Sequence, residues 1–214
     1  MLDNLKSKYI LQEIFEKIKN KRKLNIIKYN KRVMIKLDIN KEDFEIYITL
    51  KEYNFKYNTN IQDIDIKKLN LSRRYISNEG LKDLNKIKFK GLNELNLDKN
   101  EISDINILEK FDFQELKELY LYENNISDIK VLENVKFEKL EILRLGDNKI
   151  SDINILEKVK FKELKELYLG RNKISDIKVL ENVKFEKLEI LNLNGNKIKD
   201  KSIISKLKIK NIIL

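Results

Sequence analysis

The sequence contains no cysteine, histidine, proline, tryptophan or alanine. Without cysteine or histidine, the chain has no thiol nucleophile, no imidazole base and no thiolate or imidazole ligand for zinc. The five glycines are isolated, so neither a phosphate-binding G-x-x-x-x-G-K-[ST] loop nor a G-x-G-x-x-G turn is present. These absences exclude many enzyme classes. We predict that the protein is not an enzyme, and we expect no catalytic residue, no cofactor and no metal site.

Long apolar runs are also missing. No segment approaches the about 20 apolar residues that a membrane-spanning helix needs. The start, "MLDNLKSKYILQEIFEKIKN", mixes charged and apolar residues and has no small-residue cleavage site, so it does not resemble a signal peptide. With 42% apolar and 37% charged residues, the 214-residue chain has the composition of a soluble protein. We expect a monomer in the cytoplasm, with a nuclear location left open and no membrane association.

The net charge of +10 is concentrated near the start of the chain, where Lys17 to Arg32 holds eight basic residues and no acid. Such a segment could contact nucleic acid or an anionic lipid surface. A solvated, lysine-rich helix face explains it as well. We favour the solvated face and expect a protein partner, not nucleic acid.

A repeated frame dominates the rest of the sequence. The pattern L-x-x-L-x-L-x-x-N-x-I recurs at a spacing of 24 from Leu92, Leu116, Leu140, Leu164 and Leu188, with a looser copy at Ile66. Fixed periods of this length are typical of solenoids. Residues 66–214 resemble the leucine-rich repeat family, including intracellular members such as the regulatory subunit of protein phosphatase 1 with its N-x-I-x-D-I repeats. The resemblance implies an α/β solenoid with a curved parallel sheet on the inner face and short helices or turns on the outer face. It also implies a scaffold or regulatory role through protein binding.

The first half of each repeat predicts a short strand that ends in asparagine. Because side chains alternate along a strand, Leu119 and Leu121 should face inward while Tyr120 and Tyr122 face out. The amide of Asn124 could pair backbone groups that a packed turn would leave unsatisfied. The same position gives a ladder of Asn100, Asn124, Asn148, Asn172 and Asn196.

The second half of each repeat predicts a helical turn. Ser127 or Asp128 should cap it, and Ile129, Leu132 and Val135 should lie on its buried face. An aromatic column closes the units, and we expect it to be core: Phe89, Phe113, Phe137, Phe161 and Phe185, with Ile209 last. A ladder of acids could suggest calcium, but its capping position favours a structural role: Asp104, Asp128, Asp152, Asp176 and Asp200.

The first 60 residues have a different pattern, so we divide the chain into a helical region, 1–60, and about six repeats, 61–214. A solenoid end exposes core, and a helical cap would cover it. The stretch "KYILQEIF" from Lys8 to Phe15 also resembles the start of an F-box. That resemblance implies an alternative function, in which residues 5–40 dock on a cullin-ligase adaptor and the repeats select a substrate.

Residues that point out of the predicted strands are the candidate binding site. Tyrosine and arginine most often anchor interfaces, although a Tyr–Arg stack could also simply stabilise the sheet. The predicted partner-binding residues are Asn96, Asp98, Tyr120, Tyr122, Glu123, Arg144, Asp147, Tyr168, Arg171 and Asn192.

An internal comparison supports the same face. Residues 116–143 and 164–191 differ only at 122/170, 123/171 and 125/173, and the next differences fall at 144/192, 146/194 and 147/195. All six positions lie on or beside the predicted inner face, while outer residues such as Lys130 and Lys178 are identical. Packing alone does not explain why the inner positions changed while exposed outer residues stayed the same. We interpret this distribution as the result of selection on a recognition groove.

Overall fold

The structure is a computed structural model that describes residues 41–61 and 64–214. The chain divides into two compact units, Met1–Lys56 and Tyr57–Leu214. The first unit includes most of helix α4 (Lys41–Tyr57), a segment whose sequence suits helix or strand. The F-box-like residues 5–40 and the basic run Lys17 to Arg32 lie outside the described residues, so the assignment of 1–60 stays a prediction. Across 41–61 and 64–214, no helix is long and apolar enough to span a bilayer.

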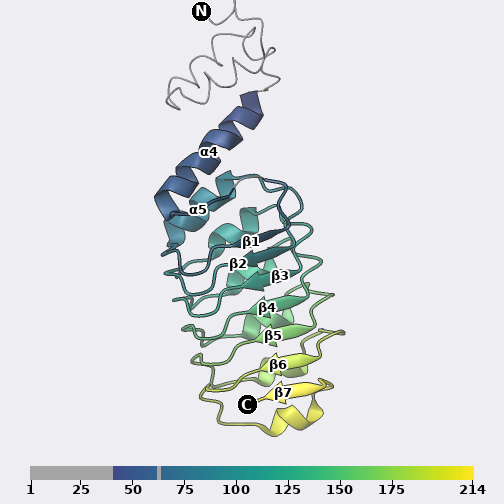
Figure 1. Ribbon diagram of the computed structural model, residues 1–214. Coiled ribbons are helices and arrows are strands. Elements are labelled where there is room, and N and C mark those ends of the chain that lie inside the picture. The colour runs from purple at the N-terminus through teal and green to yellow at the C-terminus, as the bar shows by residue number, and fades with distance from the viewer. Residues whose placement is uncertain (1–40, 62–63) are drawn as a thin grey trace, which may run out of the picture. The chain divides into compact units, whose positions relative to one another are not determined.

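The second unit contains one parallel sheet in which seven strands follow one another in chain order (Figure 1). The strands are β1 (Lys68–Asn70), β2 (Glu94–Asn96), β3 (Glu118–Tyr120), β4 (Ile142–Arg144), β5 (Glu166–Tyr168), β6 (Ile190–Asn192) and β7 (Asn211–Ile213). From β2 to β6 each residue pairs with the residue 24 positions later. The end repeats differ in length, because Lys68 pairs with Glu94 and Ile190 with Asn211.

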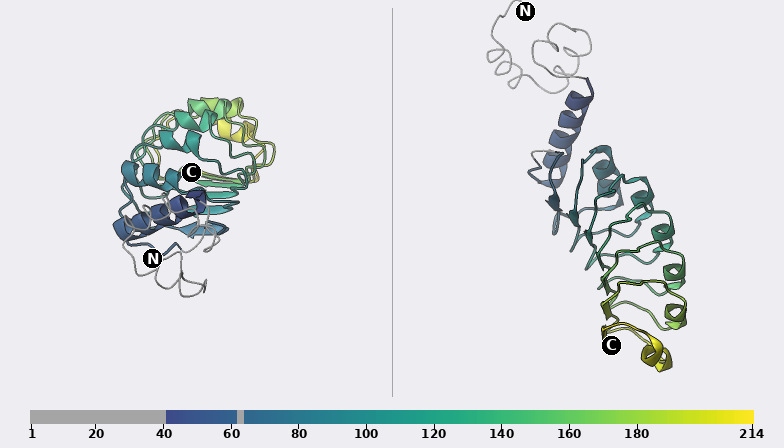
Figure 2. Two further views of the ribbon diagram at one scale, coloured as in Figure 1. Left: turned by 90° about the horizontal axis from the view of Figure 1, so that it is seen from above. Right: turned by 90° about the vertical axis from the view of Figure 1, so that its right-hand side faces the viewer.

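The return segments carry short helices on one side of the sheet (Figure 2, right). They are α5 (Asn78–Lys86) and the 3-10 helices η2 (Asn106–Lys110), η3 (Lys130–Glu133), η4 (Asn154–Glu157), η5 (Lys178–Glu181) and η6 (Ser202–Lys206). The predicted α/β solenoid of strands and short helical turns is therefore confirmed.

The core lies between the sheet and these helices. Leu119 and Leu121 are fully buried, and each of β2 to β6 has a buried central leucine between two partly exposed residues. Burying one such leucine side chain stabilises the folded state by about 1.5–3 kcal/mol. The prediction for Val135 is wrong: η3 ends at Glu133, so Val135 lies beyond it and is partly exposed, while Val131 is buried in its place.

The phenylalanine column is core over most of its length. Phe89, Phe113, Phe137 and Phe161 are buried, with ring centroids 6.5 Å apart for Phe89 and Phe113 and 6.4 Å apart for Phe113 and Phe137. Phe185 is partly exposed. The buried rings therefore fill the same place in successive repeats.

The asparagine ladder joins each repeat to the one before it. Asn148, which is 8% exposed, donates through Nδ2 to the carbonyl oxygens of Leu121 (2.9 Å) and Leu145 (3.1 Å). Its Oδ1 accepts a hydrogen bond from the backbone N–H of Ile126 at 2.9 Å. Equivalent bonds form at Asn100, Asn124, Asn172 and Asn196. The predicted role of these amides is confirmed.

The aspartate ladder also has the predicted structural role. Asp128 accepts a hydrogen bond from the backbone N–H of Lys130, the first residue of η3, at 2.9 Å. Ile129 occupies the N-cap position itself, so the aspartate acts from one residue earlier and Ser127 is not the cap. The same bond recurs at Asp104, Asp152, Asp176 and Asp200.

We predict that Asn148→Ala lowers the free energy of unfolding by about 1–3 kcal/mol, because buried backbone groups of two repeats lose their partner. Urea denaturation followed by circular dichroism measures the loss. Asn134→Ala, which changes an exposed asparagine at the end of η3, is the matched control and should unfold like the wild type. Equal midpoints for both variants would contradict the role of the ladder.

Candidate functional site

The exposed residues of the sheet lie in columns that run across the strands. This surface, which we call the strand face, comprises the outward residues of β2 to β6 and the second and third residues that follow each strand. The register aligns the middle column, which contains Asn96, Tyr120, Arg144, Tyr168 and Asn192. Backbone hydrogen bonds continue past the strands, for example from Lys99 N–H to Tyr122 O at 2.8 Å. The columns at Asp98/Tyr122 and Glu123/Asp147/Arg171 are therefore ordered as well.

A cation–aromatic stack occupies the centre of the strand face. The guanidinium carbon of Arg144 lies 5.0 Å from the ring centroid of Tyr120 and 4.8 Å from that of Tyr168. These three residues stand on adjacent strands in direct register. Each cation–aromatic contact is worth about 0.5–1 kcal/mol at an exposed site. The Nε atom of Arg144 is buried and has no hydrogen-bond partner within the described part of the chain.

Two glutamates fix the tyrosines from the neighbouring column. Tyr120 donates its hydroxyl hydrogen to Glu118, and Tyr168 donates to Glu166 at 2.8 Å. Burial and the hydrogen bond to Glu118 raise the pKa of Tyr120 above its ordinary value, and burial and Glu166 do the same for Tyr168. Both phenols are therefore protonated at neutral pH. The glutamates were not predicted as site residues, but their spacing of two from each tyrosine puts them on the same face.

Asp98 is a half-buried acid beside the stack. Its Oδ1 accepts a hydrogen bond from the backbone N–H of Tyr122 at 2.7 Å. Burial raises the pKa of Asp98, and the hydrogen bond from Tyr122 and the positive charges of Arg144 and Lys99 oppose that rise. Its carboxylate thus supports the backbone of the next repeat as well as lying on the strand face.

Packing of a glycine against a larger side chain in the neighbouring repeat explains the changes at 122/170 and 146/194. A Cβ atom at Gly146 would lie 3.3 Å from Cδ2 of Tyr122, so glycine leaves room for this ring. At the equivalent pair, Gly170 leaves room for Asn194, whose Oδ1 a Cβ at 170 would overlap. Each glycine accommodates a neighbour across the sheet, and positions 122/146 and 170/194 are therefore coupled by packing.

Ion pairs explain a second difference. Glu123 pairs with Lys99 at 3.0 Å, whereas Arg171, its equivalent, pairs with Asp147 at 3.6 Å. Each residue therefore has the charge opposite to that of its partner in the preceding repeat. The prediction that packing does not explain the changed positions is therefore wrong at 122/170, 146/194 and 123/171. No contact explains the change from Asn125 to Lys173.

The column that contains Glu123, Asp147 and Arg171 lies in left-handed turns. Its φ angles are 57° at Lys99, 55° at Glu123, 54° at Asp147, 54° at Arg171 and 67° at Gly195. Non-glycine residues in this region cost free energy unless the surrounding structure fixes them. The backbone bonds from Glu123 N–H to Gly146 O (3.0 Å) and from Asp147 N–H to Gly170 O (2.8 Å) hold these turns.

The two outer asparagines of the middle column are the least available of the predicted residues. The Oδ1 of Asn96 accepts from the backbone N–H of Asp98 at 2.9 Å, and that of Asn192 accepts from Asn194 N–H at 3.0 Å. Both amides therefore stabilise local turns. The structure brings Tyr120, Arg144 and Tyr168 together most closely.

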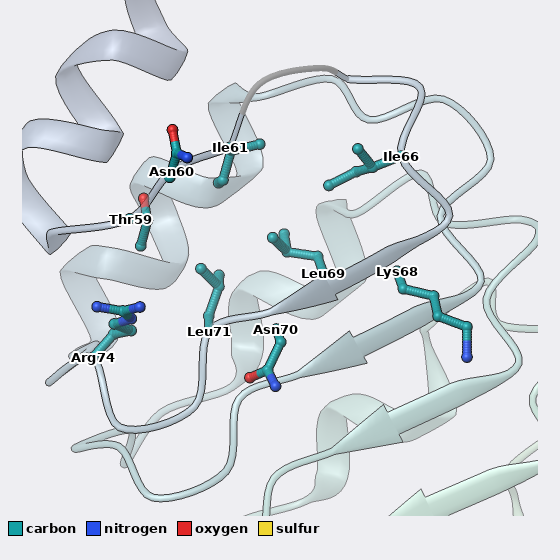
Figure 3. A pocket seen from close by; sticks show the side chains of 9 residues that line it. All are labelled: Thr59, Asn60, Ile61, Ile66, Lys68, Leu69, Asn70, Leu71 and Arg74. Carbon is teal, nitrogen blue, oxygen red and sulfur yellow. The ribbon is translucent and has the colours of Figure 1, made fainter.

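A hollow of about 340 Å³ lies at the β1 end of the sheet (Figure 3). Leu69, Leu71, Ile61 and Ile66 give it an apolar wall, while Arg74 at its rim donates from Nη1 to the carbonyl oxygen of Asn58 at 2.7 Å. Arg74 stands where later repeats have the ladder asparagine. The hollow therefore reflects the atypical first repeat and contains none of the predicted site residues.

Comparison with known proteins agrees with the repeat architecture. Residues 114–158 and 162–207 match the family model described as Leucine Rich repeats (2 copies). The crystal structure of an internalin C2 from Listeria monocytogenes has a TM-score of 0.50 and 22% identity, over 78% of this chain and 95% of that one. No curated protein matches the sequence.

Two further similar structures are longer than this chain. An internalin (inlF) from Listeria monocytogenes has a TM-score of 0.47 and 26% identity, over 61% of this chain and 43% of its own. A leucine-rich repeat protein of Leptospira interrogans has a TM-score of 0.45 and 24% identity, over 62% of this chain and 39% of its own. The chain thus spans less than half the length of these two structures.

We predict that Gly170→Tyr destabilises the fold by about 1–3 kcal/mol, because the ring meets Asn194. Adding Asn194→Gly should recover part of this loss, because it removes the overlap of a Cβ at 170 with Oδ1 of Asn194 but leaves the contact of 2.9 Å with Oδ1 of Asn192. A double-mutant cycle by urea denaturation measures the coupling. The single variant Asn194→Gly supplies the fourth corner, and additive effects would show that the two positions are independent.

Proposed function

Because Tyr57–Leu214 forms a leucine-rich repeat solenoid, we propose that this protein is a non-enzymatic interaction module that binds a protein partner on its strand face. The role is that of a scaffold or regulatory subunit. The partner-binding surface comprises the predicted residues around the stack of Tyr120, Arg144 and Tyr168.

The stack is the observation that carries the proposal. Its three members belong to the residue types that most often dominate binding energies, and they are adjacent at the centre of the sheet. The cation–aromatic contacts and the glutamate hydrogen bonds hold them in one arrangement before a partner arrives. A fixed arrangement lowers the entropy cost of binding.

The core does not depend on the same side chains. The buried residues of these strands are Leu119, Leu143 and Leu167, each 0% exposed. The stack can therefore be truncated without opening a core cavity, which allows binding and stability to be measured separately.

Location, oligomeric state and the region before the repeats stay predictions. We propose a cytoplasmic monomer, with the nuclear location still open. The alternative, an F-box-type substrate receptor of a cullin ubiquitin ligase, needs residues 5–40, which lie outside the described residues, and no described contact favours it over a scaffold.

We predict that Tyr120→Ala/Arg144→Ala/Tyr168→Ala removes partner capture while the fold persists. Each anchor typically contributes about 2 kcal/mol or more to an interface, so the triple variant should lose over 90% of the specific partner. Affinity purification from native cells, with quantitative mass spectrometry, measures the loss.

The matched control is Lys130→Ala/Glu133→Ala/Lys178→Ala, a triple variant of exposed residues on η3 and η5. It should capture the same partners as the wild type, and circular dichroism should show that both variants are folded. Unchanged capture by the stack variant would assign the stack a purely structural role.

A further inference from the structure

The charge of the strand face is opposite in sign to that of the whole protein. The outward residues of β2 to β6 and the turns that follow include six acids and three bases: Glu94, Asp98, Glu118, Glu123, Asp147 and Glu166, against Lys99, Arg144 and Arg171. The protein as a whole has a net charge of +10. A partner that is guided by the overall charge would be acidic, whereas a partner of the strand face would be basic.

Most of the charges on this surface already have a partner. Glu94 pairs with Lys68 at 2.6 Å, and two further pairs join the turn residues Lys99 with Glu123 and Arg171 with Asp147. Charges that are paired within the protein contribute little net attraction to an incoming group.

Four of the nine charges form no ion pair within the described residues: Asp98, Arg144, Glu118 and Glu166. Asp98 accepts the backbone hydrogen bond from Tyr122, and Arg144 lies between two tyrosine rings, which leaves the two glutamates. Within residues 41–61 and 64–214, neither carboxylate forms an ion pair with a basic side chain, and the hydrogen bonds they accept come from neutral tyrosine hydroxyls. The raised pKa values of Tyr120 and Tyr168 keep these hydroxyls protonated at neutral pH, so neither hydroxyl is itself charged.

An apolar residue separates the two carboxylates. Ile142 pairs in register with Glu118 on one side and Glu166 on the other, and it is partly exposed. Since neighbouring strands lie about 4.8 Å apart, the two glutamate backbones are about 10 Å apart. Lysine and arginine have long apolar stems with a charged end, which suits an apolar floor between two acids.

We propose that the partner docks a basic, extended segment across the strand face, with an arginine or lysine side chain over Ile142 and between Glu118 and Glu166. This inference rests on the proposed function of the same surface. The Tyr–Arg stack provides the neighbouring contact area. An acidic side chain over Ile142 would instead meet the carboxylates of Glu118 and Glu166, which disfavours an acidic segment.

The test uses the full chain and a fluorescent peptide of alternating arginine and serine, twelve residues long, with an alternating glutamate and serine peptide as its acidic counterpart. We expect fluorescence anisotropy to detect binding of the arginine peptide in spite of the positive net charge of the protein. Binding should weaken as salt rises, because the contact is electrostatic.

The decisive variant is Glu118→Gln/Glu166→Gln, which retains an acceptor for each tyrosine hydroxyl. We expect it to bind the arginine peptide about tenfold more weakly, the change that corresponds to about 1.4 kcal/mol. The matched control is Glu115→Gln/Glu163→Gln, which alters net charge equally at glutamates that precede the strands and pair with Lys139 and Lys187. The control should bind like the wild type.

Three outcomes would overturn the inference. The arginine peptide does not bind, both glutamine variants bind it equally, or the glutamate peptide binds better and loses binding in Arg144→Ala.

Capture of the native partner by the variants separates this inference from the proposed function. If capture needs the stack but not Glu118 and Glu166, the binding surface stands and the basic segment is wrong. If capture does not need the stack, both proposals fail.

Discussion

The ladder of asparagine amides that joins successive repeats is the interaction on which the rest of the structure depends. The Nδ2 of each amide bonds carbonyl groups of its own repeat and the preceding one, and the Oδ1 accepts from the preceding turn, as at Asn148. A backbone group left unpaired in this interior would cost about 1–3 kcal/mol. These bonds require the chain to return to the same place every 24 residues. The strand register, and with it the alignment of Tyr120, Arg144 and Tyr168, follows from that requirement.

Much of the fold could be predicted because repetition turns a weak local pattern into a strong one. The inward leucines, the asparagine ladder and the aspartate bonds each recur several times, so their roles can be read from position alone. Val135 was misplaced because the length of a 3-10 turn depends on where the chain must rejoin the core. The left-handed turns at Glu123 and Asp147 have no glycine signal, since the surrounding hydrogen bonds impose that conformation.

The side chains that point out of the strands could be predicted, but their contacts could not. Alternation along the strands indicates which side chains face out, and the resulting columns contain the Tyr–Arg stack. Contacts between repeats, such as the ring of Tyr122 beside Gly146 or the pair of Arg171 with Asp147, depend on side-chain directions that spacing does not specify. Several differences between the duplicated repeats are therefore matched changes within the protein. What supports recognition is the arrangement itself. A fixed aromatic–arginine centre lies beside two glutamates that form no ion pair within the described residues, on a protein of positive net charge.

Hydroxyl-radical footprinting of the protein with and without its purified partner is the most direct test that the strand face is the binding surface. Tyr120 and Tyr168 are partly exposed on that face, while Tyr75, 79% exposed, lies outside it and is the internal control. We expect the partner to lower labelling of Tyr120 and Tyr168 and to leave Tyr75 unchanged. Unchanged labelling of Tyr120 and Tyr168 in the complex would contradict the account.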